Sequence, residues 1–386
     1  MSVRLSNTAG VVERVPFADL SRQWRQIEAE AMPEIKALFE AGAFSLGPWV
    51  DQFEERVASY LGAPYAIGVN SGTSALHLAM IAAGVGRGDK VLVPANTFIA
   101  TAWAVLYVGA EPILCDVTTA SWTIDLADAE RRVLPDVKAI VPVHLYGQPA
   151  DMEAVQAFAR YHGLVIIEDA AQAIGARFDG RSLGTIGQLG CFSFYPAKNL
   201  GAAGEAGLVV TQHADIAKRV RALRHHAQSE RYLHHELGFN YRMEGLQGLV
   251  LGHKLRFLER WTEERRRVAA MYRDSLADLP LELPRVANGD HVWHLFVVHT
   301  PARDALRAHL AELGIATGLH YPVPLHRQPC FANRDLDRES FPNSDRNARE
   351  CLSLPLFEGI SEAEIARVIE GVRSYFRKAR LCENTA

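Results

Sequence analysis

Lys198 is the first residue whose type and surroundings suggest chemistry. It stands alone in CFSFYPAKNLGAAGEAGLVV, between an aromatic-rich stretch and a run of Gly and Ala. A lysine in such a place can grip a phosphate or act as a covalent catalyst. The phosphate-binding pattern G-x-x-x-x-G-K-[ST] does not occur here, because Ala197 precedes the lysine and Asn199 follows it. The pattern therefore favours covalent and proton-moving chemistry.

The turn NSGTS, residues 70–74, is a second candidate. It follows the apolar run YAIGV and precedes a helical pattern. Small residues let backbone amides point outward, and a helix N-terminus attracts anions, so Gly72 and Thr73 could hold a phosphate. Ordinary helix capping by Ser71 or Thr73 explains the same residues equally well.

Asp169, at the end of LVIIED, is the third candidate. A carboxylate held at a strand end can keep a heteroaromatic nitrogen protonated through an ionic hydrogen bond. Taken alone, Asp169 is more simply explained as the cap of a following helix. Together, the acid, the phosphate turn and Lys198 are the three contacts that a pyridoxal phosphate enzyme requires: a partner for the pyridine nitrogen, a phosphate cradle and a Schiff-base lysine.

Alternating patterns must position these candidates. From about Phe53 to Val210, helical stretches such as FEERVASYLG alternate with short apolar runs such as KVLVP. This alternation predicts a doubly wound α/β fold, in which a mostly parallel sheet is covered by helices on both faces. Ligands bind such a sheet where strands end and helices begin, and all three candidates stand at predicted strand ends.

The chain is long enough for one large domain and a smaller one. With 386 residues, 48% of them hydrophobic, it can bury a large core and a satellite core. We expect residues 1–255 to contain the N-terminal segment and the large domain. After a long amphipathic helical pattern, the segments HVWHLFVVHT and DALRAHLAELGI predict a small α+β domain over residues 256–386.

Composition excludes several kinds of partner. The formal net charge of −4, with scattered Lys and Arg, provides no basic surface for nucleic acid. No run approaches the roughly 18 apolar residues that a membrane span needs. The five cysteines are far apart and form no C-x-x-C pair, so neither a disulfide framework nor a zinc site is indicated. We expect a soluble protein of the reducing cytoplasm.

Two further motifs are not assigned a role. GVGRGDK lies between a helix and a strand, the reverse order of a dinucleotide-binding turn, and is interpreted as a helix C-cap and turn. The histidines His225, His226, His234 and His235 lack the spacing of H-E-x-x-H, so no metal site is expected.

Several longer motifs resemble one protein family. The chain is similar to the DegT/DnrJ/EryC1/StrS sugar aminotransferases from about Val15 to Tyr375, and the likeness is carried by NSGTSALHLA, PANTFIATAWAVLYVGAEPILCDV, VHLYG, EDAAQAIGA, SFYPAKNLGAAGEAG, GFNYRMEGLQGLVLGHKL and GLHYPVPLH. The resemblance implies a fold-type I pyridoxal phosphate enzyme that acts on nucleotide-linked ketosugars. SFYPAKNLGA is most similar to the branch that aminates C3 of dTDP-3-keto-6-deoxyhexoses.

The resemblance also implies roles for single residues. Lys198 would bind the cofactor as a Schiff base and Asp169 would pair with its ring nitrogen. The other implied cofactor contacts are Gln172 near the ring hydroxyl, Gly72, Thr73 and Ser193 at the phosphate, and Phe98 on the ring face. Members of the family are homodimers with shared active sites, in which Asn240 would reach the partner's phosphate.

The residues implied to contact the sugar rest on the same resemblance. Tyr195, His320 and Tyr321 would line the hexose pocket, and Arg231 would face the nucleotide sugar from the partner chain. Strand packing is the alternative for Tyr195, because aromatic residues are common in sheets. A solvated surface charge is the alternative for Arg231.

The expected reaction is transfer of an amino group from L-glutamate to a nucleotide-linked keto-deoxysugar. Lys198 must then act as a base, so its pKa, about 10.4 in a free lysine, must be lowered, and we expect burial and nearby positive charge to do this. Amination at C4 or of a cyclitol is an alternative within the family. Deoxygenating relatives carry His in place of the lysine, and a non-catalytic regulator would be expected to have lost the three candidates.

Overall fold

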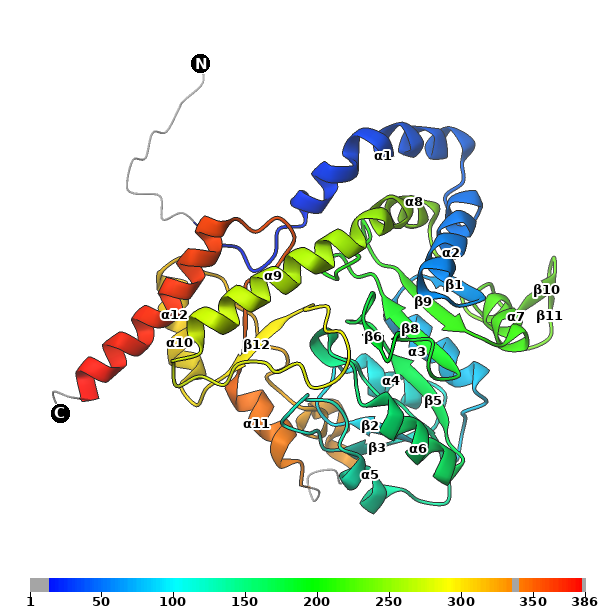
Figure 1. The fold of residues 1–386 in the computed structure, drawn as a ribbon. Helices are drawn as coiled ribbons and strands as arrows, with labels where there is room; N and C mark the ends of the chain where they lie inside the picture. The colour runs from blue at the N-terminus through cyan, green and yellow to red at the C-terminus, as the bar shows by residue number, and fades with distance from the viewer. Residues whose placement is uncertain (1–13, 335–339, 384–386) are drawn as a thin grey trace.

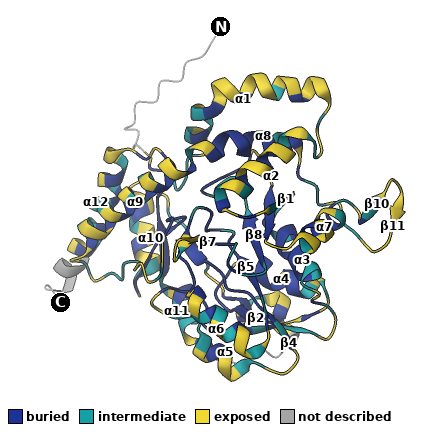
Figure 2. Cartoon of the chain, turned by 45° about the vertical axis from the view of Figure 1, so that its right-hand side comes forward, coloured by how far each residue is buried: buried dark blue, intermediate teal, exposed yellow. Residues whose placement is uncertain are grey.

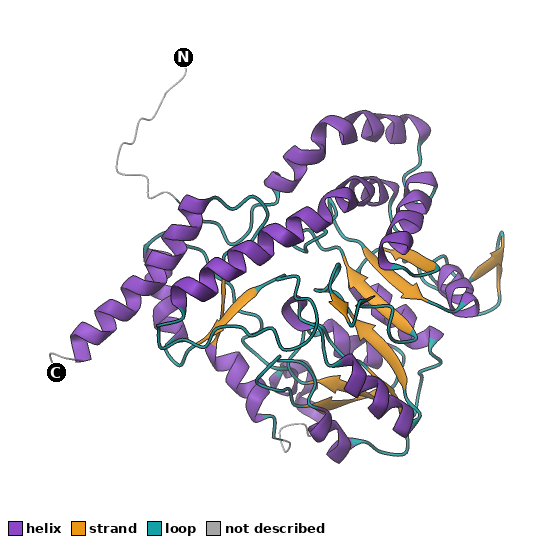
Figure 3. Cartoon of the chain, in the orientation of Figure 1, coloured by secondary structure: helices purple, strands orange, loops and turns teal. Residues whose placement is uncertain are grey.

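A seven-stranded sheet forms the centre of the protein. The structure is a computed structural model that describes residues 14–334 and 340–383. The sheet has the order β1-β9-β8-β5-β4-β2-β3 and lies among helices (Figure 3). Its strands are β1 (Tyr65–Val69), β2 (Lys90–Pro94), β3 (Glu111–Cys115), β4 (Val137–Ile140), β5 (Val165–Asp169), β8 (Leu189–Ser193) and β9 (Gly207–Thr211).

Most strands are parallel, as predicted, but β9 is not. The pairs β2 with β3, β2 with β4, β4 with β5 and β5 with β8 are parallel. β9 runs antiparallel to both β8 and β1. Residues 194–206, between β8 and β9, form a loop rather than a helix. Because a parallel neighbour would need a crossover connection, the chain turns back directly and β9 runs antiparallel to β8. This loop carries Lys198.

Helices cover both faces of the sheet (Figure 1). Successive residues of β2 show this, since Val91 and Val93 belong to one buried cluster and Leu92 belongs to another. The first cluster includes residues of α3, α4 and α7, and the second includes residues of α2, α6 and α8. The helices of this part are α1 (Ser21–Ala41), α2 (Pro48–Leu61), α3 (Gly72–Ala82), α4 (Ala100–Tyr107), α5 (Leu126–Arg132), η1 (Leu145–Gly147), α6 (Met152–His162), α7 (Ala214–Leu223) and α8 (Gly245–Lys254).

The C-terminal part contains its own buried cluster. The predicted long helix is divided into α8 and α9 by a short 3-10 turn, η2 (Leu255–Phe257). Beyond it lie α9 (Leu258–Leu276), β12 (Phe296–His299), α10 (Arg303–Glu312), η3 (Leu325–Arg327), η4 (Pro329–Arg334), α11 (Pro342–Glu350), β13 (Cys351–Leu354) and α12 (Glu362–Glu383). β12 and β13 pair antiparallel.

The proposed division into two domains is supported by a separate core. A buried cluster built from α9, α10, β12, β13 and α12 supports a smaller unit over residues 256–386. Val15, from the N-terminal segment, also packs in this cluster and bridges to Ile315. The N-terminal segment therefore contacts the C-terminal part before the chain enters α1.

Two short hairpins complete the fold. β6 (Arg177–Phe178) pairs with β7 (Arg181–Ser182), and β10 (Gln228–Glu230) pairs with β11 (Leu233–His234). The β10–β11 hairpin projects away from the body of the protein, and its surface is exposed (Figure 2). Within the described residues, none of the helices has the length and apolar composition of a membrane span. Over the same residues, no group of three or more His, Cys, Asp or Glu could hold a metal ion.

Candidate active site

A cavity of about 690 Å³ brings most of the predicted residues together. It opens at the carboxyl ends of β1, β5 and β8, the edge at which ligands were expected. The predicted residues that line it are Gly72, Thr73, Phe98, Asp169, Gln172, Ser193, Tyr195, Lys198, His320 and Tyr321. Arg231 and Asn240 do not line the cavity of their own chain.

Lys198 extends from the β8–β9 loop into this cavity. Its backbone N–H donates to the carbonyl of Tyr195 at 2.8 Å, which gives the loop a tight turn at the lysine. Burial lowers the pKa of the Lys198 amine from 10.5 to about 8, which is the expected direction. The other expected cause, nearby positive charge, is wrong, because the charge that acts on Lys198 is that of Asp169, which raises its pKa.

Asp169 stands at the end of β5 and is only 5% exposed. Its Oδ2 accepts from the hydroxyl of Thr101 at 2.7 Å, and its Oδ1 accepts from the N–H of Ala171 at 3.2 Å. Burial raises the pKa of Asp169, and these two hydrogen bonds oppose the rise. The helix-cap alternative is wrong, because residues 170–176 form turns. The carboxyl group is thus held in place by two hydrogen bonds.

Glu168, beside Asp169 in the sequence, has a different environment. Neighbouring side chains of a strand point to opposite faces, so Glu168 is turned away from the cavity and is fully buried. It accepts from the N–H groups of Gly184, Ile186 and Gly187 at 2.6 to 2.7 Å, and His144 Nε2 lies 3.0 Å from it. Of the two adjacent acids, only Asp169 is available to a ligand.

The turn before α3 has the form of an anion site. Ser71 caps the helix by accepting from the N–H of Ser74 at 3.0 Å, so the capping interpretation is correct for this residue. Ser71, Gly72 and Thr73 all line the cavity at the helix N-terminus, where the helix dipole attracts negative charge. A Cβ added at Gly72 would lie 2.7 Å from the Cβ of Ser193. The absence of a side chain at Gly72 therefore lets Ser193 approach the turn.

The opposite wall of the cavity comes from the C-terminal part. Gln172 donates to the Tyr321 hydroxyl at 3.1 Å and accepts from the Tyr146 N–H at 2.6 Å. The Tyr146 hydroxyl donates to the carbonyl of His320, whose Nδ1 lies 2.8 Å from the Ser353 hydroxyl. Burial lowers the pKa of His320 to about 4 and raises the pKa of Tyr321, so both side chains are neutral near pH 7. His320 and Tyr321 therefore offer hydrogen-bonding groups without charge.

Two aromatic residues that were predicted for the site also line the cavity. Phe98 is 52% exposed, and its ring centroid lies 5.7 Å from that of Tyr321. Tyr195 is 51% exposed and follows the end of β8 at Ser193. Strand packing of Tyr195 is therefore wrong, and its side chain is available to a ligand.

Sequence reasoning missed Phe17 and Thr101. The Phe17 ring stacks on His320, with centroids 5.7 Å apart, and lines the cavity. Thr101 donates a hydrogen bond to Asp169, but in its segment, NTFIAT, the family resemblance implies a role only for Phe98. Neither residue had a distinguishing pattern in the sequence, because each lies far along the chain from the residue it contacts.

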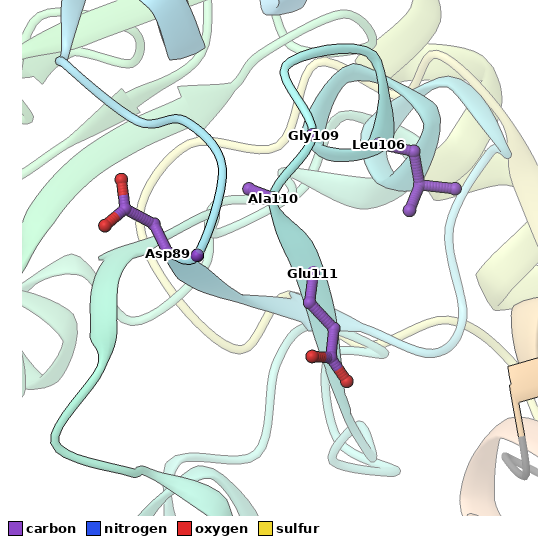
Figure 4. Close-up of a pocket in the computed structure, with 6 residues that line it drawn as sticks. Asp89, Leu106, Gly109, Ala110 and Glu111 are labelled. Atoms are coloured by element: carbon purple, nitrogen blue, oxygen red, sulfur yellow. The ribbon is translucent and has the colours of Figure 1, made fainter.

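A second hollow lies beside the unassigned turn GVGRGDK. It has a volume of about 270 Å³ and is lined by Gly88, Asp89, Leu106, Gly109, Ala110 and Glu111 (Figure 4). Asp89 and Glu111 stand at the starts of β2 and β3, the sheet edge away from the one where ligands bind in this type of fold. Its two carboxylates would repel an anion, so the hollow offers no phosphate cradle.

Arg231 and Asn240 are exposed on or near the β10–β11 hairpin. The Arg231 guanidinium lies over the Tyr232 ring, 5.1 Å from its centroid. The Asn240 carbonyl accepts from the side chain of Asn70 at 3.4 Å, and the Asn240 side chain is left at the surface. Within its own chain, Arg231 is therefore a surface residue whose charge is exposed to solvent.

Comparison with known proteins identifies the family. The profile of the DegT/DnrJ/EryC1/StrS aminotransferase family matches residues 25–373. The chain belongs to this family. Membership and the intact cavity make the protein a pyridoxal phosphate-dependent sugar aminotransferase.

Three relatives of this aminotransferase match it over nearly their whole length. The pleiotropic regulatory protein of Geobacillus stearothermophilus is 42% identical, with 94% of this chain and 99% of the relative covered. The dTDP-3-amino-3,4,6-trideoxy-alpha-D-glucose transaminase of Streptomyces venezuelae is 42% identical, with 94% and 96% covered. The UDP-N-acetyl-3-dehydro-alpha-D-glucosamine 3-aminotransferase of Acidithiobacillus ferrooxidans is 41% identical, with 93% and 97% covered.

Solved structures agree with this assignment. The structure of S. venezuelae DesV in complex with a ketimine intermediate has a TM-score of 0.91 and 42% identity, and covers 94% of this chain and 98% of its own. The structure of NtdA from Bacillus subtilis with bound cofactor PMP has a TM-score of 0.89 and 29% identity, with 96% and 87% covered.

The cavity of the aminotransferase fits a phosphorylated pyridine. Its volume of about 690 Å³ is in the usual range for cofactor sites. A helix N-terminus lines it and suits a phosphate, an acid held by two hydrogen bonds lines it and suits a ring nitrogen, and a lysine with a lowered pKa lines it as well.

Proposed function

We propose that this aminotransferase transfers the amino group of L-glutamate to a nucleotide-linked 3-keto-6-deoxyhexose, and that the product is an aminosugar nucleotide. The observation that carries the proposal is the single cavity, in which Lys198, Asp169 and the α3 N-terminus face His320 and Tyr321. Relatives that are named as 3-aminotransferases of dTDP and UDP sugars support amination at C3.

The large-domain wall would hold the cofactor. Gly72, Thr73 and Ser193 would bind the phosphate, where the helix N-terminus supplies N–H groups. Asp169 would accept a hydrogen bond from the ring nitrogen. Burial raises the pKa of Asp169, and the positive charge of a protonated ring nitrogen would favour its ionised form. Gln172 would lie near the ring hydroxyl. Phe98 would cover one face of the ring.

When bound, pyridoxal phosphate supplies an electron sink for the carbanion formed at the substrate carbon. Lys198 would bind the cofactor covalently and, once released, would take the proton from the α-carbon of glutamate. With a pKa of about 8, an appreciable share of the Lys198 amine is neutral near pH 7.5, so it can act as a base. Asp169, 5% exposed and tied to Thr101, would keep its orientation while Lys198 moves the proton.

The sugar would be oriented by the opposite wall. Tyr195, His320 and Tyr321 would contact the hexose, and neutral groups suit hydroxyl recognition because they can donate or accept without a counter-charge. One cavity would thus serve the donor and the sugar in turn.

The working unit would be a homodimer of the cytoplasm with shared active sites. Arg231 and Asn240 are exposed and lie outside the cavity of their own chain, so they are free to reach a partner's cavity. The projecting β10–β11 hairpin supports this arrangement (Figure 1).

Other functions have less support. A C4 or cyclitol aminotransferase would use the same cofactor wall, and it differs from the proposal only in the sugar. A non-catalytic regulator would not need the three cofactor contacts, all of which line one cavity here.

The test is direct. The purified protein should show a visible absorption band that L-glutamate bleaches, and a panel of dTDP-, UDP- and GDP-ketosugars should restore it, with a dTDP-3-ketosugar the most effective. The absence of a chromophore that glutamate bleaches would refute the aminotransferase proposal. Restoration only by 4-ketosugars would refute amination at C3. Sedimentation of the protein as a monomer would refute the dimer.

A further inference from the structure

Lys254 is a buried lysine to which the proposed function assigns no task. It is the last residue of α8 and is only 6% exposed. Burial lowers the pKa of Lys254 to about 8, which reflects the cost of placing an ammonium group away from water. Glu358, whose charge acts against this shift, is itself bound to Arg265 Nε at 2.5 Å. A buried ammonium group is costly unless hydrogen bonds or an opposite charge compensate it.

The hydrogen bonds of Lys254 lead to the loop that carries Lys198. Its Nζ donates to the carbonyl of Gly201 at 2.6 Å and to Gln23 Oε1 at 3.0 Å. The Gln23 side chain, 2% exposed on α1, donates in turn to the carbonyl of Asn199 at 3.3 Å. Two carbonyls that closely follow Lys198 are therefore held by one buried pair.

The loop depends on such contacts for its shape. Residues 194–206 have no helix or strand to set their backbone angles. The loop is also compact, since a Cβ added at Gly201 would lie 2.1 Å from the carbonyl oxygen of Pro196. On its other side, the Asn199 side chain donates to the carbonyl of Val292 at 2.9 Å. Removing one support should change the position of the lysine.

We propose that Lys254 and Gln23 are positioning residues that clamp the loop after Lys198 and keep its amine enclosed in the cavity. The inference rests on the proposed role of Lys198. An ammonium group suits this task because it offers three donors and forms stronger hydrogen bonds to carbonyls than a neutral donor does. The clamp joins α1 and α8 to the loop, so it acts from outside the cavity.

The test uses the cofactor-free full chain and reads Lys198 itself. Acetic anhydride labels neutral amines, and peptide mass spectrometry with a free amino acid as reference gives the labelling of Lys198 against pH. The midpoint should lie near pH 8 in the wild type, as burial predicts. In Lys254→Met the loop should loosen and admit water, so the midpoint should rise by about one unit, which makes labelling near pH 7 about tenfold slower.

Two further variants sharpen the result. Lys36→Met makes the same change at an exposed lysine of α1 and should leave the midpoint unchanged. Gln23→Leu removes only the 3.3 Å bond to Asn199 and the acceptor of Lys254, so a smaller shift in the same direction is expected. If Lys254→Met does not fold, Gln23→Leu decides the question by the same measurement.

The outcomes separate the inference from the proposed function. An unchanged Lys198 midpoint in folded variants, even with a lowered melting temperature, would overturn the inference, because the pair would then be merely stabilising. A wild type that lacks a glutamate-sensitive chromophore would overturn the proposed function, whatever the labelling shows.

Discussion

One wall of the cavity is anchored on strand ends, and the residues of the other lie outside regular structure. Asp169 and Ser193 are the last residues of β5 and β8, so sheet hydrogen bonds place them. His320 and Tyr321 lie outside regular structure and are placed by side chains, among them Gln172 and Ser353. A rigid sheet edge suits a cofactor that stays bound, whereas a loop wall can differ between enzymes that take different sugars.

The predicted residues of the two walls also differ in charge. Burial lowers the pKa of Lys198 and raises that of Asp169, so the first wall holds two groups whose charged forms are disfavoured until they gain partners. Burial keeps His320 and Tyr321 neutral on the other wall. We therefore expect changes on the first wall to abolish the chemistry in both half-reactions, and changes on the second wall to alter only the use of the sugar.

The largest effect is expected for Lys198→Ala. Loss of the amine removes both the covalent link and the base, so turnover should fall by at least about 1,000-fold. The protein should still fold, because a buried amine is removed and no large cavity is created. Turnover and the visible spectrum, with the melting temperature as control, measure this; substantial residual transamination would contradict the assigned role.

Asp169→Asn should lower turnover by about 100-fold or more, because a neutral amide cannot hold a charged ring nitrogen as a carboxylate does. Its effect on stability should have the opposite sign in the cofactor-free protein. The raised pKa means that the folded state disfavours the carboxylate, so ionisation costs stability above the unfolded pKa of about 3.9, and the amide avoids this cost at pH 7. Equal losses of activity and cofactor-free melting temperature would favour a purely structural role for Asp169.

Cofactor uptake should depend on pH through Lys198. The neutral amine is the reactive form, so with a pKa of about 8 the rate should rise about 50-fold between pH 6 and pH 8 and then level off. Stopped-flow absorbance on mixing cofactor with the cofactor-free protein measures this rate. A rise that continues unbroken to pH 10 would mean that the cavity does not depress the pKa of Lys198.

The smallest effect is expected for Tyr321→Phe. It removes the hydroxyl that accepts from Gln172 but keeps the ring beside Phe98. We expect kcat/KM for the ketosugar to fall about tenfold, in line with the loss of one or two hydrogen bonds, and the half-reaction with glutamate to change little. Measuring the two half-reactions separately decides it; equal losses in both would remove the distinction between the walls.

Prediction from sequence succeeded where the information is local along the chain. The apolar runs predicted the strands, and residues predicted at their ends, such as Asp169, line the cavity. It failed where the answer depends on distant segments. Thr101 binds Asp169 from α4, and Phe17 reaches His320 from the N-terminal segment, so neither could be found by spacing. The antiparallel direction of β9 was missed because alternation alone does not say whether a connection crosses over.

The fold class, the family motifs and the set of chemical groups could be found without coordinates, since strand periodicity and residue type are properties of short segments. The tertiary structure shows why Asp169, and not Glu168, faces the cavity and why the pKa of Lys198 is low. Glu168 and Asp169 are chemically alike, and only the direction of each side chain from β5 separates them. The pKa of Lys198 is set by the atoms that enclose it, which come from every part of the chain.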